Sequence, residues 1–359
     1  MCPAALRERL LAENADALAL TDVINIGYCT GFIGVLDDEP AHVALITGTQ
    51  SIIFTDSRYY EAMHHAAEGS PWHVQLVDGW LVPAVADELA ATGARRVAIE
   101  SSMPHSRFAA FADAVDAEVI EAAGWVEVLR AVKAAGEIGA IDAAQELTDR
   151  AFAHLLGGML RAGATERQIA LELEFFMRRE GSEGVAFPPI VASGPNSALP
   201  HALPGERALA KGDFVVLDFG ARLGGYCADM TRTVVIGSAS DRQREVYDAV
   251  LAANVAGTAA ARAGLAGRDI DAAARSVIAE RGFGEYFGHG VGHGVGREVH
   301  ELPRVGPRSE APVEAGAVIT IEPGIYIPGF GGVRIENLAV VEEGGVRVLT
   351  RSSMDLLEL

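Results

Sequence analysis

Short apolar runs alternate with Ala-rich amphipathic stretches along the first ~128 residues of the chain. The runs are rich in β-branched residues and have the length of strands, whereas the stretches between them have helical periodicity. The predicted strands are Ala17–Leu20, Val43–Thr47, Ser51–Thr55, His73–Val77, Val97–Glu100 and Glu118–Glu121, and Ser57–Glu68 and Leu81–Ala91 are predicted helices. Strands alternating with helices favour an α/β layer in this part of the chain.

The pattern changes after this region. From Trp125 onward, apolar residues recur at helical spacing through two segments, and Thr165–Glu180 predicts a further helix with Thr165 as its N-cap. Beyond Pro188, glycine-rich turns separate strand-like runs, with one Ala-rich helical region at Asp241–Gly282. We therefore expect two domains, residues 1–128 and 129–359.

Two segments of the second domain share a template. In each, a glycine lies six residues before a carboxylate that ends a β-branched strand, and a second carboxylate flanks the next strand. The segments are KGDFVVLDFG (Lys211–Gly220, with Asp218, then Asp229) and AGAVITIEPG (Ala315–Gly324, with Glu322, then Glu336). This repetition predicts a pseudo-twofold half-barrel whose strand-end acids point into a shared centre.

These four acids lie beside strands of Val, Ile, Leu and Phe. Burying them together without partners costs several kcal/mol each, so either they face water or a cation neutralises them. Their formal charge of −4 matches two divalent metal ions, which prefer oxygen ligands. Two adjacent ions lower the pKa of a bridging water and favour hydrolysis.

A nitrogen donor for such a site lies in GHGVGHGVGREVHE, residues 288–301. This stretch contains no phosphate-loop signature, and the glycines between His289 and His293 exclude a zinc-binding HExxH helix. A plain loop is the alternative. Glycine at every second position favours an extended segment that passes close to other backbone or to a ligand, with its histidines projecting into a cleft.

Composition narrows the class of protein further. The formal charge of −20 argues against a nucleic-acid partner, and no apolar run is long enough to span a membrane. The N-terminus is charged and has no signal-peptide core. Three cysteines without CxxC spacing indicate a reducing compartment and no disulfide framework. We expect a cytoplasmic protein.

The order Asp218, Asp229, His293, Glu322, Glu336 resembles that of the pita-bread dinuclear metallopeptidases. DFGARLGGYCADMTRT, GHGVGREVHE, TIEPGIY and VRIEN are similar to the proline-specific branch, prolidase and aminopeptidase P. SGPNSALPHALP contains His201 at the position of that family's substrate-side histidine, and TDVINIGYCTGF and FTDSRYYEA resemble its creatinase-type N-terminal domain. The resemblance implies an α+β architecture, with a creatinase-like α/β domain followed by a pita-bread domain.

The resemblance also implies roles for individual residues. Asp218 would bind one divalent ion, His293 and Glu322 the other, and Asp229 and Glu336 both, with manganese favoured over cobalt, zinc or iron. A metal-bridging hydroxide would attack the bond between an N-terminal residue and a following proline. His201 and His300 would stabilise the oxyanion, bind substrate or relay protons. Arg334 would orient substrate or a ligand carboxylate, Glu322 would shuttle a proton, and His289 would lie near the residue after the scissile bond. The resemblance further implies a homodimer acting on small peptides with proline second.

Several alternatives remain open at this point. A strict Xaa-Pro dipeptidase and an aminopeptidase P use the same ligands and differ in what closes the cleft beyond the proline. A lyase or a non-proline aminopeptidase, such as methionine aminopeptidase, would share the scaffold, and creatinase uses it without metal. A non-catalytic peptide-binding relative would have lost one of the five ligands, all of which are present here.

Overall fold

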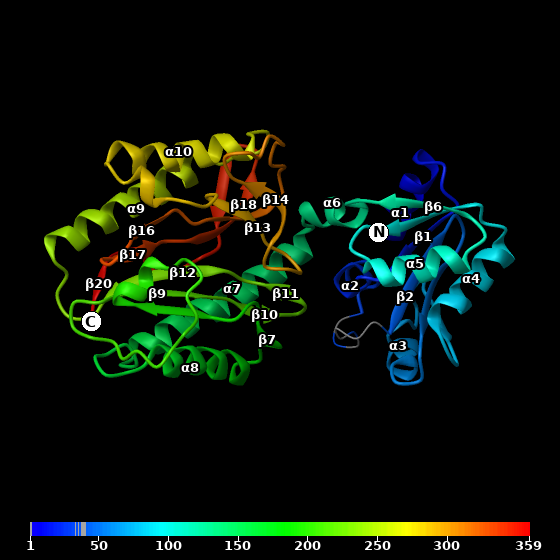
Figure 1. Ribbon diagram of the computed structural model, residues 1–359, viewed down its shortest axis with the longest axis horizontal. Helices are drawn as coiled ribbons and strands as arrows, with labels where there is room; N and C mark the ends of the chain where they lie inside the picture. Colours follow the sequence, from blue (N-terminus) through cyan, green and yellow to red (C-terminus); the bar gives the residue numbers. More distant parts are fainter. Residues whose placement is uncertain (1, 33, 35, 37–40) are drawn as a thin grey trace. The chain divides into compact units, whose positions relative to one another are not determined.

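The computed structural model describes residues 2–32, 34, 36 and 41–359, and the chain divides into two compact units, Met1–Arg130 and Ala131–Leu359 (Figure 1). Each unit has its own hydrophobic clusters and is described by itself.

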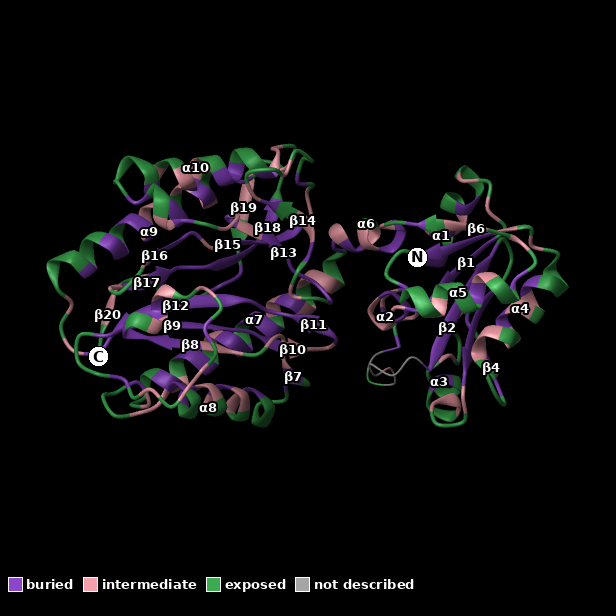
Figure 2. Ribbon diagram, in the orientation of Figure 1, coloured by how far each residue is buried: buried purple, intermediate pink, exposed green. Residues whose placement is uncertain are grey.

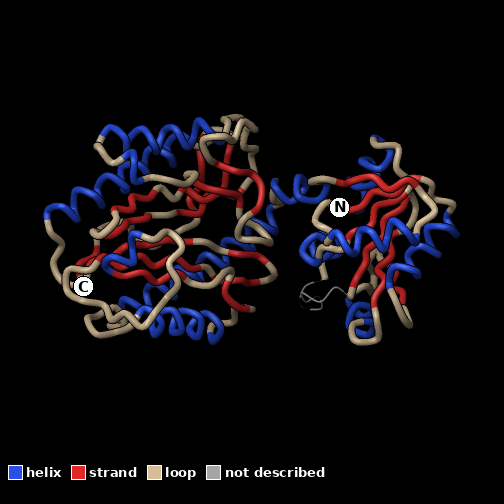
Figure 3. Tube along the Cα trace, in the orientation of Figure 1, coloured by secondary structure: helices blue, strands red, loops and turns tan. Residues whose placement is uncertain are grey.

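The first unit is built around a mixed six-stranded sheet of order β4-β3-β2-β1-β5-β6 (Figure 3). Its elements are α1 (Cys2–Ala12), β1 (Ala17–Leu20), α2 (Val23–Thr30), β2 (His42–Thr47), β3 (Ser51–Thr55), α3 (Tyr60–Ala66), β4 (His73–Leu76), α4 (Leu81–Thr92), β5 (Arg96–Glu100), α5 (His105–Ala114), β6 (Glu118–Ala122) and α6 (Trp125–Ala131). Strands β1, β2 and β3 pair antiparallel, whereas β3–β4, β1–β5 and β5–β6 are parallel. All six predicted strands are present.

The inner strands β1, β2, β3 and β5 of this sheet are buried on both faces, which explains why they read as continuous apolar runs rather than as alternating ones. Leu18 and Leu20 of β1 pack on the side covered by α1 and α2, whereas Ala17 and Ala19 pack toward α4 and α5. Figure 2 shows the resulting buried centre of the unit.

One prediction for this unit is wrong. Cys2 and Cys29 form a disulfide with their Cα atoms 5.0 Å apart, although the cysteine pattern indicated no disulfide framework. The pairing arises because α1 and α2 pack against each other and bring together residues that are 27 positions apart in the sequence. The number and spacing of the cysteines in the sequence do not reveal this tertiary contact. Cys227 is a free, buried thiol.

The second unit contains two larger sheets, of order β20-β12-β9-β8 and β14-β13-β15-β18-β19, and the smaller sheets β11-β10-β7 and β16-β17. Its elements are α7 (Ala135–Leu156), α8 (Glu166–Arg179), β7 (Gly184–Val185), β8 (Ile190–Ser193), η1 (Gly194–Ala198), β9 (Phe214–Phe219), β10 (Ala221–Leu223), β11 (Tyr226–Cys227), β12 (Met230–Val235), α9 (Asp241–Ala260), α10 (Gly267–Glu280), η2 (Gly284–Tyr286), β13 (Gly292–Gly294), β14 (Glu301–Val305), β15 (Val318–Ile321), β16 (Gly324–Ile327), β17 (Gly331–Arg334), β18 (Asn337–Glu342), β19 (Gly345–Val348) and β20 (Leu357–Glu358). Thr165 caps α8 as predicted, since its hydroxyl accepts the N–H of Gln168.

The predicted pseudo-twofold design is present in this unit. Helices α7 and α8 cover the β9–β12 sheet, and α9 and α10 cover the β15–β18 sheet in the same way (Figure 1). The template glycines Gly212 and Gly316 both have a positive φ, +87° and +89°, which only glycine adopts at low cost. Their N–H groups also make matching hydrogen bonds, 2.7 Å to Ile236 O and 2.9 Å to Val341 O. Each half therefore begins its first strand with the same turn.

Among the described residues, no helix combines the length and the apolar character needed to cross a membrane.

Candidate active site

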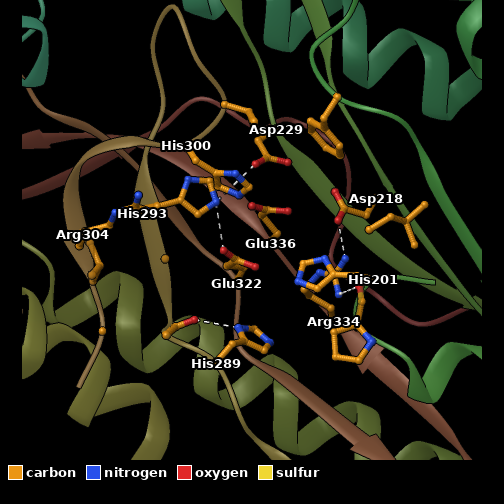
Figure 4. A pocket seen from close by; sticks show the side chains of 18 of the residues that line it. His201, Asp218, Asp229, His289, His293, His300, Arg304, Glu322, Arg334 and Glu336 are labelled. Atoms are coloured by element: carbon orange, nitrogen blue, oxygen red, sulfur yellow. Dashed lines mark hydrogen bonds and ion pairs between the residues drawn. The ribbon is translucent and has the colours of Figure 1, made fainter. Parts of the chain in front are cut away.

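The four template acids lie at the strand ends of the second unit. Asp218 is in β9, Asp229 directly precedes β12, Glu322 directly follows β15, and Glu336 directly precedes β18. In the β9–β12 ladder Asp218 pairs with Thr231, and β15 and β18 are paired antiparallel in the same manner. Figure 4 shows the four carboxylates facing one common space, as the repeat predicted.

The alternate glycines of the stretch 288–301 have a steric cause. Strand β13 runs between β14 and β15, so that an added Cβ would lie 2.0 Å from Thr320 O at Gly292 and 2.1 Å from Leu302 O at Gly294. At Gly296 it would lie 2.2 Å from a carboxylate oxygen of Glu301, whereas at Gly288 it would meet nothing within 4 Å. The prediction of an extended segment pressed against other backbone is confirmed for the central part of the stretch.

His293 lies in β13 and points into the same space as the acids (Figure 4). Its Nε2 is 3.2 Å from Oε1 of Glu322 and 3.7 Å from Oδ2 of Asp229. Its Nδ1 is 3.2 Å from the carbonyl oxygen of Gly294. A proton on Nδ1 donates to that carbonyl and leaves the Nε2 lone pair for a ligand, which is the usual orientation of a metal-binding histidine.

These contacts bring the predicted ligands together to different degrees. Ligand atoms of Asp229, His293 and Glu336 all lie within 4.8 Å of one another. Glu322 contacts His293 of this group. Asp218 faces the group and is paired with Arg334 (Figure 4).

The electrostatics of the acids indicate that a cation belongs between them. Burial raises the pKa of Asp218, and burial together with other carboxylates raises those of Asp229 and Glu336 well above the usual range. Burial also opposes ionisation of Glu322, but the hydrogen bond and charge of His293 outweigh it and lower the pKa of Glu322 to about 2. Buried oxygens Oδ1 of Asp218 and Oε1 of Glu336 have no hydrogen-bond partner within the described part of the chain. Unpaired oxygens in an oxygen-rich set with one imidazole fit divalent metal ions.

Arg334 holds the first of these acids in place. Its guanidinium donates to Oδ2 of Asp218, to the hydroxyl of Tyr326 at 2.8 Å and to Oγ1 of Thr231 at 3.0 Å. It also lies 3.4 Å from the carbonyl oxygen of Pro200. With its donors directed at these groups, Arg334 keeps the Asp218 carboxylate in a fixed orientation.

The remaining predicted histidines surround the acids. The ring of His300 packs edge-on against His293 with centroids 4.3 Å apart, and burial beside that ring lowers the pKa of His300 to about 4. Nε2 of His289 is 3.0 Å from the hydroxyl of Tyr326, and burial lowers the pKa of His289. His201 is exposed and lies near Arg334 (Figure 4).

One cavity of about 760 Å³ is lined by the four acids, the four histidines, Arg334 and Tyr326. Its apolar wall includes Phe187, Pro188 and Pro189, together with Pro200 and Leu203. The cavity is large enough for a short peptide and combines apolar lining residues with carboxylates.

Sequence reasoning missed three residues of this cavity and its surroundings. Tyr326 connects His289 to Arg334, Thr231 connects Arg334 to Glu336, and Arg304 lines the cavity as an exposed cation. The available signal for Thr231 was period-two spacing. Thr231 lies two residues after Asp229, and side chains two residues apart in a strand point to the same face. Arg304 is the cross-strand partner of His293 in the β13–β14 ladder, a register that the sequence did not reveal.

Four carboxylates and the imidazole of His293 converge at the pseudo-twofold centre of two helix-covered sheets, and this is the donor set of an enzyme that uses divalent ions. The known families agree with this class. The Creatinase/Prolidase N-terminal domain matches residues 4–132, and metallopeptidase family M24 matches residues 139–343. The chain belongs to metallopeptidase family M24, and the expected creatinase-type domain followed by a pita-bread domain is confirmed.

Individual relatives cover nearly the whole chain. It is 41% identical over 346 residues to the uncharacterized peptidase YqhT of Bacillus subtilis, a match that covers 96% of each chain. Among solved structures it is similar to an Xaa-Pro dipeptidase from Bacillus anthracis, with a TM-score of 0.94 and 39% identity over 100% of this chain and 99% of that one. It is also similar to an X-Pro aminopeptidase from Thermotoga maritima, with a TM-score of 0.89 and 37% identity over 99% and 100% of the two chains.

Proposed function

We propose that this protein is a metal-dependent Xaa-Pro peptidase, which hydrolyses the bond between an N-terminal residue and a following proline. The observation that carries the proposal is the convergence of Asp229, His293 and Glu336 within 4.8 Å, in a cavity whose wall contains Phe187, Pro188 and Pro189. The names of the similar dipeptidase and aminopeptidase support the same specificity.

The residues that would hold two divalent ions are Asp218, Asp229, His293, Glu322 and Glu336. The buried, unpaired oxygens of Asp218 and Glu336 in the described structure support this assignment. When bound, the ions supply Lewis acidity that activates water and polarises the scissile carbonyl. Arg334 keeps the Asp218 carboxylate in a fixed orientation, and the contact of His293 Nδ1 with Gly294 O keeps Nε2 turned toward the acids.

The other groups of the cavity would handle the substrate. A peptide bond to proline has no N–H, so a strand-like backbone clamp cannot hold it. The apolar wall would instead receive the proline ring. His201 and His300 lie on different sides of the acids and would donate hydrogen bonds to the developing oxyanion. Glu322 would accept the proton of the attacking water and return it to the leaving nitrogen.

Arg304 favours a free dipeptide over a longer peptide. Residues directly opposite each other in an antiparallel ladder project to the same face, so the register places Arg304 on the face of His293. Its guanidinium would bind a carboxylate that follows the proline directly. An open cleft would make the protein an aminopeptidase P instead.

The experiment that tests the function uses chelator-stripped protein reloaded separately with manganese, cobalt and zinc. Each form is assayed with Xaa-Pro, Xaa-Pro-Yaa and Xaa-Ala peptides. Cleavage of Xaa-Pro alone identifies a dipeptidase, and cleavage of the tripeptide identifies an aminopeptidase. Metal-dependent cleavage of Xaa-Ala at an equal rate would remove the proline specificity, and no metal-dependent cleavage would remove the function. His293→Ala should abolish both manganese uptake and turnover.

A further inference from the structure

The loop of residues 194–205, which we call the His201 loop, brings Pro200, His201, Ala202 and Leu203 to the cavity. Its two ends meet at the side chain of a residue outside the cavity, Glu166, the first residue of α8. Glu166 is completely buried, which is rare for a glutamate unless its carboxylate is fully paired.

Glu166 binds the loop on both sides of His201. Oε1 accepts the N–H of Ser193 at 2.8 Å, the hydroxyl of Ser193 at 2.7 Å and the side-chain amide of Asn196 at 3.1 Å. Oε2 accepts the N–H of Gly205 at 3.1 Å. One carboxylate therefore closes the loop at its base, and both of its oxygens are used.

A nearby cation, Arg207, is linked to Glu166 through the hydroxyl of Ser193. The guanidinium of Arg207 donates to the hydroxyl of Ser193 at 2.5 Å and pairs with Asp213 at 2.6 Å. The pKa of Arg207 is raised, chiefly by Asp213 and in part by Glu166. The base of the loop is thus a closed network of charged and hydroxyl groups.

The fold itself does not require a carboxylate at the start of α8. The second half of the unit begins α10 at a corresponding position, because Ala266 is its N-cap residue and bridges to Pro312 as Thr165 bridges to Ala208, although Ala266 makes no side-chain cap hydrogen bond. The residue after that cap is Gly267. The carboxylate is an addition specific to the half that contains the His201 loop.

The His201 loop is also hydrogen-bonded to β17, the strand that contains Arg334. The hydroxyl of Ser197 accepts the N–H of Gly332 in β17 at 2.8 Å, and Arg334 lies 3.4 Å from the carbonyl oxygen of Pro200. His201 lies between this tie and the Glu166 anchor. We propose that Glu166 is a positioning residue that sets the location of His201 over the pocket. Its catalytic consequence rests on the proposed function.

The test is a double-mutant cycle between Glu166 and His201. In otherwise wild-type protein, Glu166→Ala should lower kcat/KM for an Xaa-Pro peptide by on the order of 10-fold or more, with the roughly 100-fold or greater loss of a preorganised oxyanion donor as its upper range. In the His201→Ala background, the same change should lower it less than about 2-fold, because two residues that act through one another are not additive. An undiminished effect in that background would overturn the proposal.

Glu166→Gln keeps the volume of the side chain and should retain part of the activity, because only one of its two terminal atoms still accepts a hydrogen bond. Manganese affinity, measured by titration calorimetry, should match that of wild type in both variants. A loss of metal binding would show that Glu166 supports the whole site and would contradict a role confined to His201.

Glu100 offers a matched control. It is also buried, and it accepts the N–H groups of Thr21 and Asp22 and the side-chain amide of Asn25, but it lies in the first unit and does not line the cavity. Glu100→Gln should leave kcat/KM for the Xaa-Pro peptide within about 2-fold of wild type, because Glu100 does not line the cavity.

Hydrogen exchange separates this proposal from the proposed function, because it requires no turnover. Peptides covering residues 194–205 should exchange faster in Glu166→Ala than in wild type, with Glu166→Gln between them. Unchanged exchange would overturn the anchoring role, even if the wild-type enzyme cleaves Xaa-Pro peptides. Faster exchange in a protein without such activity would leave the anchor standing and remove only the function.

Discussion

The hydroxyl of Thr231 donates a 2.7 Å hydrogen bond to Oε2 of Glu336, and the same oxygen of Thr231 accepts Nε of Arg334. This contact fixes the Glu336 carboxylate and leaves Oε1, which has no hydrogen-bond partner among the described residues, directed at the proposed ions. We expect Thr231→Val to lower manganese affinity about 10- to 100-fold, as loss of a group that orients a ligand does. Thr231→Ser keeps the hydroxyl and should bind as wild type. Equal calorimetric affinities of the two variants would contradict the orienting role.

Asn254 connects the two glutamates from behind. Its side-chain amide donates to the carbonyl of Ile321 at 2.7 Å and to that of Ile335 at 2.9 Å, the residues that directly precede Glu322 and Glu336. Asn254→Leu removes both hydrogen bonds, each of which contributes about 0.5–1.5 kcal/mol to the free energy of unfolding. Denaturant unfolding should show this loss, and manganese affinity should fall with it.

Thr258→Val is the control for this prediction. Thr258 meets the other end of the same amide, with its hydroxyl 3.5 Å from the side-chain oxygen of Asn254, so both donors stay in place. Its manganese affinity should equal that of wild type. A comparable loss in Thr258→Val would show that packing of α9, rather than the two donated hydrogen bonds, determines the effect.

The sequence predicted the parts of the fold that depend on local pattern. Strands β1 and β3 have the predicted bounds, and the repeat around Gly212 and Gly316 identified both the pseudo-twofold design and the positions of the acids. These succeed because strand periodicity and left-handed turns depend on neighbouring residues alone.

What the sequence left open depends on contacts between distant segments. The Cys2–Cys29 disulfide requires the packing of α1 on α2, and Tyr326 enters the site only because His289 and Arg334 lie on either side of its hydroxyl. Arg304 becomes a site residue through its register with His293. No local pattern specifies pairings of this kind.

The glycines of β13 give a steric prediction. Gly294→Ala places a methyl group about 2 Å from the backbone oxygen of Leu302, which must move, and overpacking of this kind costs about 1–3 kcal/mol or more. The methyl group added by Gly288→Ala would have no atom within 4 Å. This variant should therefore have the same denaturant midpoint as wild type. Chemical denaturation of the two variants checks this, and equal midpoints would show that β13 adjusts without cost.

Glu100 makes the stability of the first unit depend on pH. Burial raises the pKa of Glu100 to about 7 from an ordinary 4.5, despite the N–H donors of Asp22 and Thr21 that favour the anion. The folded state therefore binds the proton more tightly than the unfolded state does, so this contribution to stability is full below pH 4.5 and is lost as the pH rises through 7. The loss corresponds to about 3 kcal/mol.

Glu100→Gln cannot titrate and isolates this contribution. Unfolding free energies of variant and wild type, measured by denaturant at pH 5 and pH 8, should diverge in favour of the variant as the pH rises. A constant difference between the two proteins would mean that the hydrogen bonds to Glu100 hold its pKa near the ordinary value.

We expect Arg304 to determine whether the proposed cleft accepts peptides longer than a dipeptide. Because it lies opposite His293 and lines the cavity, its guanidinium can bind the free carboxylate of an Xaa-Pro dipeptide. Hydrogen bonds to a charged group contribute about 1.5–3 kcal/mol, so Arg304→Leu should raise KM for the dipeptide about 10- to 100-fold with little change in kcat. The amide Xaa-Pro-NH2, which has no carboxylate, should lose less than about 2-fold with the same variant, and Arg304→Lys should recover part of the dipeptide affinity. Equal losses for the dipeptide and its amide would show that Arg304 shapes the cavity without reading the carboxylate, and would favour an aminopeptidase cleft that stays open beyond the proline.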